Sequence, residues 1–477
     1  MVTFLIALAA LLIGFFVYGK IIDNFFKPTD APTPAVRKND GIDFVPLPTW
    51  KVFLIQLLNI AGLGPIFGAL AGALWGPCVY FWIVGGTIFA GSVHDYLSGM
   101  ISLREDGKSL SEIVGEYLGD RILLVMRIFL LVLLILVGTV FTVGPAGLLK
   151  MLTGVNLTVL LLIILAYYFL ATLLPIDALI GRLYPIFGIC FIVMALGVMG
   201  GMLLNASSYM PEMVLANLNP KGDELPIWPL MFITVACGAI SGFHATQSPM
   251  MARCLKSEKL ARPVFYGAMV SEGIIALIWA AAGITFFHGT GGLGEALAAN
   301  GPGGVVHQIT IGFMGDGVGM VLAMIGVIVC PITSGDTALR SARLILADWF
   351  KLQQDSMKNR LMLALPLIII AGVITQMDFN ALWRYFAWVN QSIATIMLWT
   401  GAVYMVMKLE GKAFFAALIP AVFMTAVTVT YILHAPEGLQ LPLTLSTSVG
   451  LTCAAICLIQ FWRNRNQFGM STGLHTH

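Results

Sequence analysis

Two apolar stretches decide the fold of this chain: "LLNIAGLGPIFGAL" (57–70) and "ITVACGAISGFHATQSPM" (233–250). Each lies in a segment apolar enough to span a membrane, yet each carries glycine, proline or polar residues near its middle. A helix that breaks in hydrocarbon frees backbone N–H and C=O groups, which are costly to leave unsatisfied. Breaks are tolerated where the loosened backbone lines a cavity, so a pair of them predicts a transporter's binding site.

The composition points to an all-α integral membrane protein. The chain has 477 residues, of which 58% are hydrophobic and 10% charged, and its mean hydropathy is +0.91. Roughly a quarter of the residues of a soluble protein are charged. The seven cysteines form no CxxC pair, so neither a disulfide framework nor a structural zinc site is expected. We expect no cofactor other than a coupling ion, and no nucleic-acid partner.

Runs of about 17–25 apolar residues predict membrane-spanning helices. The remaining segments read as loops, the longer ones at 20–50, 205–225 and 288–315. Two short interfacial helices are expected, at Ser109–Asp120, where Ser109 and Glu112 form a capping box, and at Ala338–Phe350. Thirteen spans are predicted, near 3–19, 51–73, 78–102, 122–144, 156–174, 183–204, 227–250, 262–287, 316–335, 360–376, 380–407, 413–434 and 441–462.

The placement of positive charge predicts the orientation. All but four of the 26 lysines and arginines fall in alternate connections, those after the odd-numbered spans. The exceptions are Lys150, Lys221 and Arg384 on the opposite side and Arg127 within a span. Because cytoplasmic loops are rich in Lys and Arg, we expect the N-terminus outside and the C-terminus in the cytoplasm of a bacterial inner membrane.

The two broken spans are the second and the seventh, so they cross the membrane in opposite directions. This arithmetic predicts an inverted repeat of five helices in each half. The predicted organisation is an extra helix and cytoplasmic loop (1–50), a first repeat (51–205, broken helix 51–73), an extracytoplasmic loop (206–225), a second repeat (226–407, broken helix 227–250) and two extra helices with a cytoplasmic tail (408–477).

Five motifs resemble the carbon starvation protein A family: "GLGPIFGALAGALWGP" (62–77), "PIDALIGRLYPIFG" (175–188), "ACGAISGFHATQSP" (236–249), "PITSGDTALRSAR" (331–343) and "LWRYFAWVNQSIAT" (382–395). Longer members of that family carry a Leu-Asp pair where this chain has Gly335 and Asp336, so it resembles a shorter branch. The resemblance implies a leucine-transporter-like fold and the uptake of peptides or pyruvate.

A finer likeness concerns a cation site. "NIAGLG" (59–64) and "CPITS" (330–334) are similar to the unwound first core helix and the sodium-binding stretch of sodium-coupled neurotransmitter-type symporters. The resemblance implies a cation, sodium in particular, since hard cations prefer oxygen ligands. Its implied ligands are the carbonyls of Leu58, Ala61 and Cys330 and the hydroxyls of Thr333 and Ser334.

The breaks also supply candidate substrate contacts. The free N–H groups and partial positive charge at the start of a half-helix suit a carboxylate. His244 is either a hydrogen-bond donor to an anionic substrate or an ordinary structural histidine. The candidate substrate-binding residues are Gly62, Leu63, Gly64, Pro65, Gly238, Ser241, Gly242, His244 and Gln247.

Ionisable and amide side chains at membrane depth are candidates for coupling or gating, because they are costly there and usually functional. Glu272, ten residues into its span, is the first candidate for a proton-titrating carboxylate. His94 and Asp95 are adjacent and point to different helix faces, so we expect one to face the pathway and the other to anchor packing. No spacing supports a transition-metal site. The remaining candidates are Asp336, at the inner gate or in a surface pair with Arg340, and Asn390 and Gln391.

These observations predict a secondary active importer of small carboxylate-bearing nutrients, pyruvate or short peptides, that works by alternating access. An ion gradient, sodium or proton, would drive it, because the sequence contains no Walker motif for ATP. The rival functions are a channel or sensor whose broken helices line a pore, and a membrane metal-dependent enzyme. The enzyme would need a convergent His/Glu cluster, and no HExxH spacing exists.

Overall fold

The computed structural model describes residues 1–41, 44–173, 176–205, 210–235, 237–315, 317–354, 356–409 and 411–470. The described residues form a bundle of helices. By length and apolar composition alone, seven of these helices are able to cross a membrane, and eight when the bent pair Thr49–Ala61 and Gly64–Trp75 is taken as one span. The other predicted spans coincide with helices that are shorter, interrupted or more polar, such as α10 (Leu157–Leu173) and α18 (Phe379–Lys408).

The order of elements follows the predicted spans closely. The remaining helices are α1 (Val2–Phe16), α2 (Tyr18–Phe26), α3 (Pro34–Arg37), α4 (Thr49–Ala61), α5 (Ala69–Gly72), α6 (Val79–Gly86), α7 (Ser92–Arg104), α8 (Leu110–Leu118), α9 (Asp120–Thr153), α11 (Ile176–Asn205), α12 (Phe232–Thr234), α13 (His244–Ala252), α14 (Gly267–Phe286), α15 (Thr290–Met314), α16 (Val318–Phe350), α17 (Met357–Ile374), α19 (Phe415–His434) and α20 (Leu443–Met470).

Both predicted helix breaks are present. α4 ends at Ala61, the chain turns at Gly62 with a φ of +46°, and a helix of different direction begins at Gly64, bent by 53°. A positive φ is strained for residues with a side chain, which explains a glycine at the turn. The break is therefore Gly62 and Leu63, whereas Gly64 and Pro65 already belong to the next turn, Gly64–Gly68.

The second break is longer than the sequence indicated. α12 ends at Thr234 and α13 begins at His244, and the described residues between them, 235 and 237–243, are not helical. His244 and Gln247, expected to interrupt the span, instead lie in the first two turns of α13. His244 and Gln247 therefore mark the start of the second half-helix and do not interrupt a helix.

Two expectations about the second half of the chain were wrong. The segment 288–315, expected to be a loop, forms α15, which is kinked at Gly301 (φ +65°) just before Pro302. Its glycine content lowered the helical signal. The expected interfacial helix 338–350 is instead the end of α16, which runs unbroken for 33 residues through Pro331. Arg340 and Arg343 are largely buried on this helix, so its polar residues face protein and not the interface.

The predicted capping box is confirmed. α8 begins after Ser109, whose side chain and that of Glu112 make the reciprocal bonds to each other's backbone. Such a cap satisfies two of the orphan N–H groups at a helix start. α8 thereby makes a short turn before the long α9.

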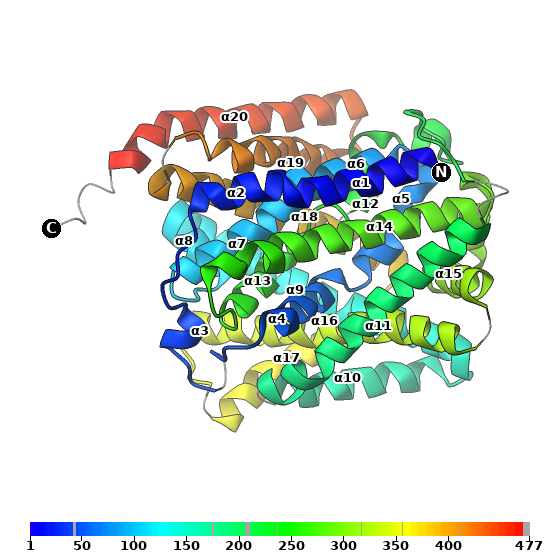
Figure 1. Ribbon diagram of the computed structural model, residues 1–477, viewed down its shortest axis with the longest axis horizontal. Helices are drawn as coiled ribbons and strands as arrows, with labels where there is room; N and C mark the ends of the chain where they lie inside the picture. The colour runs from blue at the N-terminus through cyan, green and yellow to red at the C-terminus, as the bar shows by residue number, and fades with distance from the viewer. Residues whose placement is uncertain are drawn as a thin grey trace.

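The helices lie roughly side by side along one direction (Figure 1). α19 and α20 lie at one edge of the bundle in this view, and α10 and α17 lie at the opposite edge. The broken helices, with α9, α14 and α16, occupy the middle. This all-α arrangement agrees with the predicted leucine-transporter-like fold. The repeat boundaries stay a prediction.

Candidate functional site

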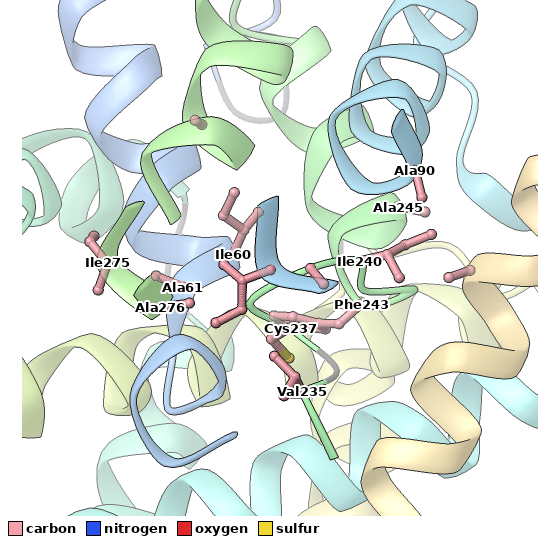
Figure 2. Packing of buried hydrophobic residues seen from close by; sticks show 14 of the residues in the cluster. Ile60, Ala61, Ala90, Val235, Cys237, Ile240, Phe243, Ala245, Ile275 and Ala276 are labelled. Atoms are coloured by element: carbon pink, nitrogen blue, oxygen red, sulfur yellow. The ribbon is translucent and has the colours of Figure 1, made fainter. Parts of the chain in front are cut away.

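The two breaks meet in the middle of the bundle. A Cβ built on Gly64 would lie 2.0 Å from the Cβ of Cys237, and one built on Gly238 would lie 2.6 Å from the Cβ of Ala276. Figure 2 shows Cys237 and Phe243 of the second break near the end of α4, where Ala61 lies beside Ala276 of α14. Only glycine allows this approach, because any side chain would collide with the opposite segment. The two breaks form one centre.

Neighbouring helices satisfy several of the backbone groups freed by the second break. The N–H groups of Gly242 and Phe243 donate to the carbonyl and side-chain oxygens of Asn390, at 3.2 and 2.7 Å. The carbonyl of Gly238 accepts from Thr87 (3.1 Å). These N–H groups are thus engaged by α18, although the sequence had suggested them for a substrate carboxylate.

The amides of α18 hold the second break in place. The Asn390 side chain also donates to the Ser241 hydroxyl at 3.0 Å, and Gln391 donates to the carbonyl of Ile240 at 2.9 Å. Both amide side chains are buried. Asn390 and Gln391, predicted as gate candidates, therefore contact the broken segment directly.

Four buried titratable side chains form a continuous chain beside this centre. Asp95 on α7 accepts from or donates to two imidazoles, with Oδ1 2.8 Å from Nδ1 of His94 and Oδ2 2.9 Å from Nδ1 of His244. Nε2 of His244 lies 3.3 Å from Oε2 of Glu272 on α14. All four side chains are 0% exposed. The chain joins α7, α13 and α14 through His244, the first residue after the break.

This geometry differs from the expectation for His94 and Asp95. The sequence indicated that the two point to different faces with different tasks. In the structure the imidazole of His94 bends back to the neighbouring carboxylate, so both belong to one cluster. Side-chain reach allows this contact, which residue spacing on a helix does not show.

The structure brings together most of the oxygens implied for a cation site. The hydroxyl of Ser334 lies 3.1 Å from the carbonyl oxygen of Leu58 and 3.1 Å from that of Cys330, and the Thr333 hydroxyl lies 2.7 Å from the latter. Ala61 ends α4 one turn beyond Leu58. The donor set fits a hard cation, because it combines carbonyl oxygens of α4 and α16 with hydroxyls. In this arrangement the hydroxyls donate to the carbonyls.

Asp336 lies deep in the bundle and not in a surface pair. Its side chain is 0% exposed, and its Oδ2 accepts a hydrogen bond from Tyr184 at 2.8 Å. The Arg340 guanidinium lies 3.9 Å from Oδ1 and donates to the carbonyl of Ala171. The expected surface pair is thus a buried polar cluster between α10, α11 and α16, next to Thr333.

A cavity of about 320 Å³ opens along the outer part of α13. Thr246 and Pro249 line it on one side, and Ser341 and Asp348 of α16 on another. Thr246 also accepts a hydrogen bond from the side chain of Gln247 (2.7 Å). The cavity is therefore lined by the direct neighbour of Gln247, a predicted substrate-binding residue.

The sequence interpretation missed two polar residues of α4. Gln56 donates to the hydroxyl of Ser248 at 3.0 Å, and Asn59 is fully buried. The signal was available, since two amides one turn apart stand in an otherwise apolar span. In the described part of the chain, no three His, Cys, Asp or Glu side chains are arranged to hold a metal ion.

The sequence is similar to those of known transporters. It is 41% identical over 351 residues to an "Uncharacterized membrane protein" of Haemophilus influenzae, covering 63% of this chain and 95% of that protein. It is 28% identical to the peptide transporter CstA of Escherichia coli (56% of this chain, 47% of the relative) and 27% identical to the pyruvate/proton symporter BtsT of the same organism (53% and 44%). The matched region spans about half the length of these two named relatives.

Solved structures with the same fold are also transporters. A manganese transporter of Eremococcus coleocola superposes with a TM-score of 0.54 at 12% identity, covering 90% of this chain and 99% of that one. Mhp1, a nucleobase-cation-symport-1 family transporter in a closed conformation, gives 0.53 at 14% identity (88% and 92%). The model of the family described as "Carbon starvation protein CstA" matches residues 1–152, 145–290 and 280–431. This multi-pass membrane protein is a transporter, and it belongs to the carbon starvation protein CstA family.

Proposed function

We propose that this chain is a proton-coupled importer of small carboxylate-bearing nutrients, pyruvate or short peptides. One observation carries the proposal: the buried chain of His94, Asp95, His244 and Glu272 beside the two helix breaks. Two carboxylates and two imidazoles in contact offer several places for an exchangeable proton. The relatives named as peptide transporters and as a pyruvate/proton symporter support the same cargo and ion.

The charges of this cluster explain how a proton would couple to transport. With both carboxylates ionised and both imidazoles neutral, the closed centre would hold two uncompensated negative charges away from water. Burying such charge is strongly unfavourable, whereas bound protons on His94 or His244 reduce it. Closure of the centre therefore requires protons, and opening to the less acidic side releases them.

The position of the cluster suits alternating access. His244 starts the half-helix α13, and the cavity along this helix reaches Thr246. A tilt of α13 against α7 and α14 would open or close the distance between His244 and its two carboxylate partners. We propose, from the loop charges, that this cavity faces the cytoplasm of a bacterial inner membrane, with the N-terminus outside and the C-terminus inside.

Sodium is a second candidate ion, and one observation favours it. Ser334, Leu58 and Cys330 place a hydroxyl and two carbonyl oxygens within 3.1 Å contacts at the end of α4. Rotation of the Ser334 hydroxyl proton away from the carbonyls would leave all three oxygens free to face a bound cation. We propose that a sodium ion, if used, is held there, with Ala61 and Thr333 completing the ligand set.

The relatives and structural neighbours support a transporter over a channel, a sensor or a membrane enzyme. The deciding experiment is uptake of labelled pyruvate and of labelled dialanine into proteoliposomes, with proton and sodium gradients imposed separately. We expect accumulation above equilibrium when the proton gradient points inward. Equilibration without accumulation under either gradient would indicate a channel, and chemical change of the cargo would indicate an enzyme; either result contradicts the proposal.

A further inference from the structure

Asn59 on α4 is buried with neither atom of its amide hydrogen-bonded to any described residue. Its neighbour one turn earlier, Gln56, is anchored to Ser248 through its nitrogen, but its oxygen also lacks a partner. An unpaired buried amide costs free energy in the empty protein, and such groups need an explanation. A bound ligand supplies one, because it would pair the atoms that the protein leaves open.

Asn59 lies on α4, which packs against α13 and against α14, the helix that carries Glu272. α4 runs toward its break and α13 runs away from its own, and the breaks touch at Gly64 and Cys237. The bond between Gln56 and Ser248 sets the register of the two helices. One turn from it toward the breaks, α4 presents Asn59 and α13 presents His244, which contacts Glu272. In Figure 2, Ile60 and Ala61 lie beside Ile275 and Ala276, the turn that follows Glu272 on α14.

The unpaired atoms at this level are mostly acceptors. The described residues leave without a hydrogen bond the amide oxygens of Gln56, Asn59 and Gln247 and both carboxylate oxygens of Glu272. Among these side chains only the Asn59 amide nitrogen is a donor without a hydrogen bond, and the one ionic contact is that of Glu272 Oε2 with His244 Nε2, at 3.3 Å. Pyruvate offers acceptors alone and would leave these oxygens open. An ammonium group brings three donors and a positive charge, which also compensates a buried carboxylate.

We propose that Glu272 and Asn59 form a subsite for the ammonium group of the cargo, such as the free amino end of a short peptide. This proposal rests on the importer function and narrows its substrate class. The ammonium would donate to a Glu272 oxygen and to the Asn59 amide oxygen. With Glu272 paired to the ammonium group, a protonated His244 would compensate the charge of Asp95. Cargo and proton would together neutralise the two carboxylates.

Equilibrium binding of labelled dialanine to the purified full-length protein tests the subsite. N-acetyl-dialanine and pyruvate both lack the ammonium group. We expect each to compete with an affinity at least about tenfold lower than that of unlabelled dialanine. Asn59→Leu should weaken dialanine binding by a similar factor and leave N-acetyl-dialanine unchanged. Asn59→Asp, which keeps an acceptor and adds charge, should restore binding of the free dipeptide.

Thr310 provides the matched control. It is also buried with an unpaired polar atom, but it lies on α15, which carries no residue of the breaks or of the titratable cluster. Thr310→Val should bind dialanine as the native protein does. Equal competition by N-acetyl-dialanine, or native affinity of a folded Asn59→Leu variant, would overturn the subsite. Proton-driven uptake of pyruvate without dialanine binding would overturn the subsite alone, whereas no accumulation of either cargo would overturn the importer function itself.

Discussion

Gly64, the first residue after the first helix break, packs against Cys237 of the second: a methyl group on Gly64 would lie 2.0 Å from the Cβ of Cys237. The first break turns α4 by 53°, and the second interrupts the span between α12 and α13. Two interrupted helices from opposite halves of the chain are therefore packed against each other at their breaks. A change in one break is transmitted to the other without any intervening residue.

Gly64→Ala should separate the two breaks. The added methyl group collides with Cys237, and overpacking of this kind costs about 1–3 kcal/mol. We expect a lower thermal unfolding temperature and an uptake rate reduced by at least about tenfold. Gly85→Ala is the control, because a Cβ there meets nothing within 4 Å. The double variant Gly64→Ala with Cys237→Gly should recover much of the activity, and no recovery would argue against direct contact.

Asp95→Asn should uncouple transport from the proton gradient. The carboxylate bridges two imidazoles, and each hydrogen bond to a charged group contributes about 1.5–3 kcal/mol. Uptake driven by an inward proton gradient should fall at least about a hundredfold, while exchange of cargo at equal pH persists. Asp106→Asn removes the same charge from an exposed loop and should transport normally. Gradient-driven uptake at the native rate in Asp95→Asn would contradict the proton role.

Ser334→Ala distinguishes the two coupling ions. The Ser334 hydroxyl contacts both Leu58 and Cys330, so its removal deletes one cation ligand and leaves two carbonyls apart. If sodium contributes, the sodium concentration for half-maximal uptake should rise at least about tenfold. Proton-driven uptake in sodium-free buffer should then be little changed. Thr428→Ala is the control, since its hydroxyl bonds only within α19.

Asn390→Ala should loosen the second break. The side-chain oxygen accepts from the Phe243 N–H at 2.7 Å, and this buried donor would lose its partner at a cost of about 1–3 kcal/mol. We expect a lower unfolding temperature and faster hydrogen exchange in 237–243, measured by mass spectrometry. Asn300→Ala on α15 serves for comparison, since its amide bonds only to a carbonyl of its own helix. Unchanged exchange in 237–243 would show that Asn390 does not hold the break.

The loop ion pair of Arg37 and Asp106 should contribute a small pH dependence to stability. The Arg37 guanidinium hydrogen-bonds Asp106 and lowers the pKa of its carboxyl below the usual value. A lowered folded-state pKa gives stability that is present above the unfolded pKa and is lost as pH falls through the folded one. Unfolding temperature measured between pH 7 and pH 3 should therefore drop less in Asp106→Asn, and salt should reduce the difference.

The sequence predicted the breaks because glycine and proline clusters interrupt two apolar runs, and backbone in hydrocarbon has few alternatives to a helix. It also predicted the order of helices and the capping box at Ser109. The sequence did not predict α15 because its glycines are typical of a loop. It did not predict the continuity of α16 because Pro331 and the arginines suggested that a helix ends there. Neither error concerns the breaks, whose physical signal is strongest.

The site was harder to predict than the fold. Glu272, His244, His94 and Asp95 stood out as costly ionisable residues, but their contacts join three helices far apart in sequence. Only packing in three dimensions shows that His244 links the two carboxylates. Asn59 was missed because an amide in a membrane span is usually satisfied by a neighbouring helix. Its lack of a hydrogen bond is visible only when all neighbours are in place.

The unbroken length of α16 gives the molecule a lever. Cys330 and Ser334 lie near its middle, and the helix continues to Phe350 without interruption. At 1.5 Å per residue, the arm beyond Pro331 is about 28 Å long. A tilt of about 5° at Cys330 and Ser334 would therefore move its far end by about 2.5 Å. A small tilt of α16 next to Leu58 would therefore displace Asp348, which lines the cavity, by about the width of a water molecule.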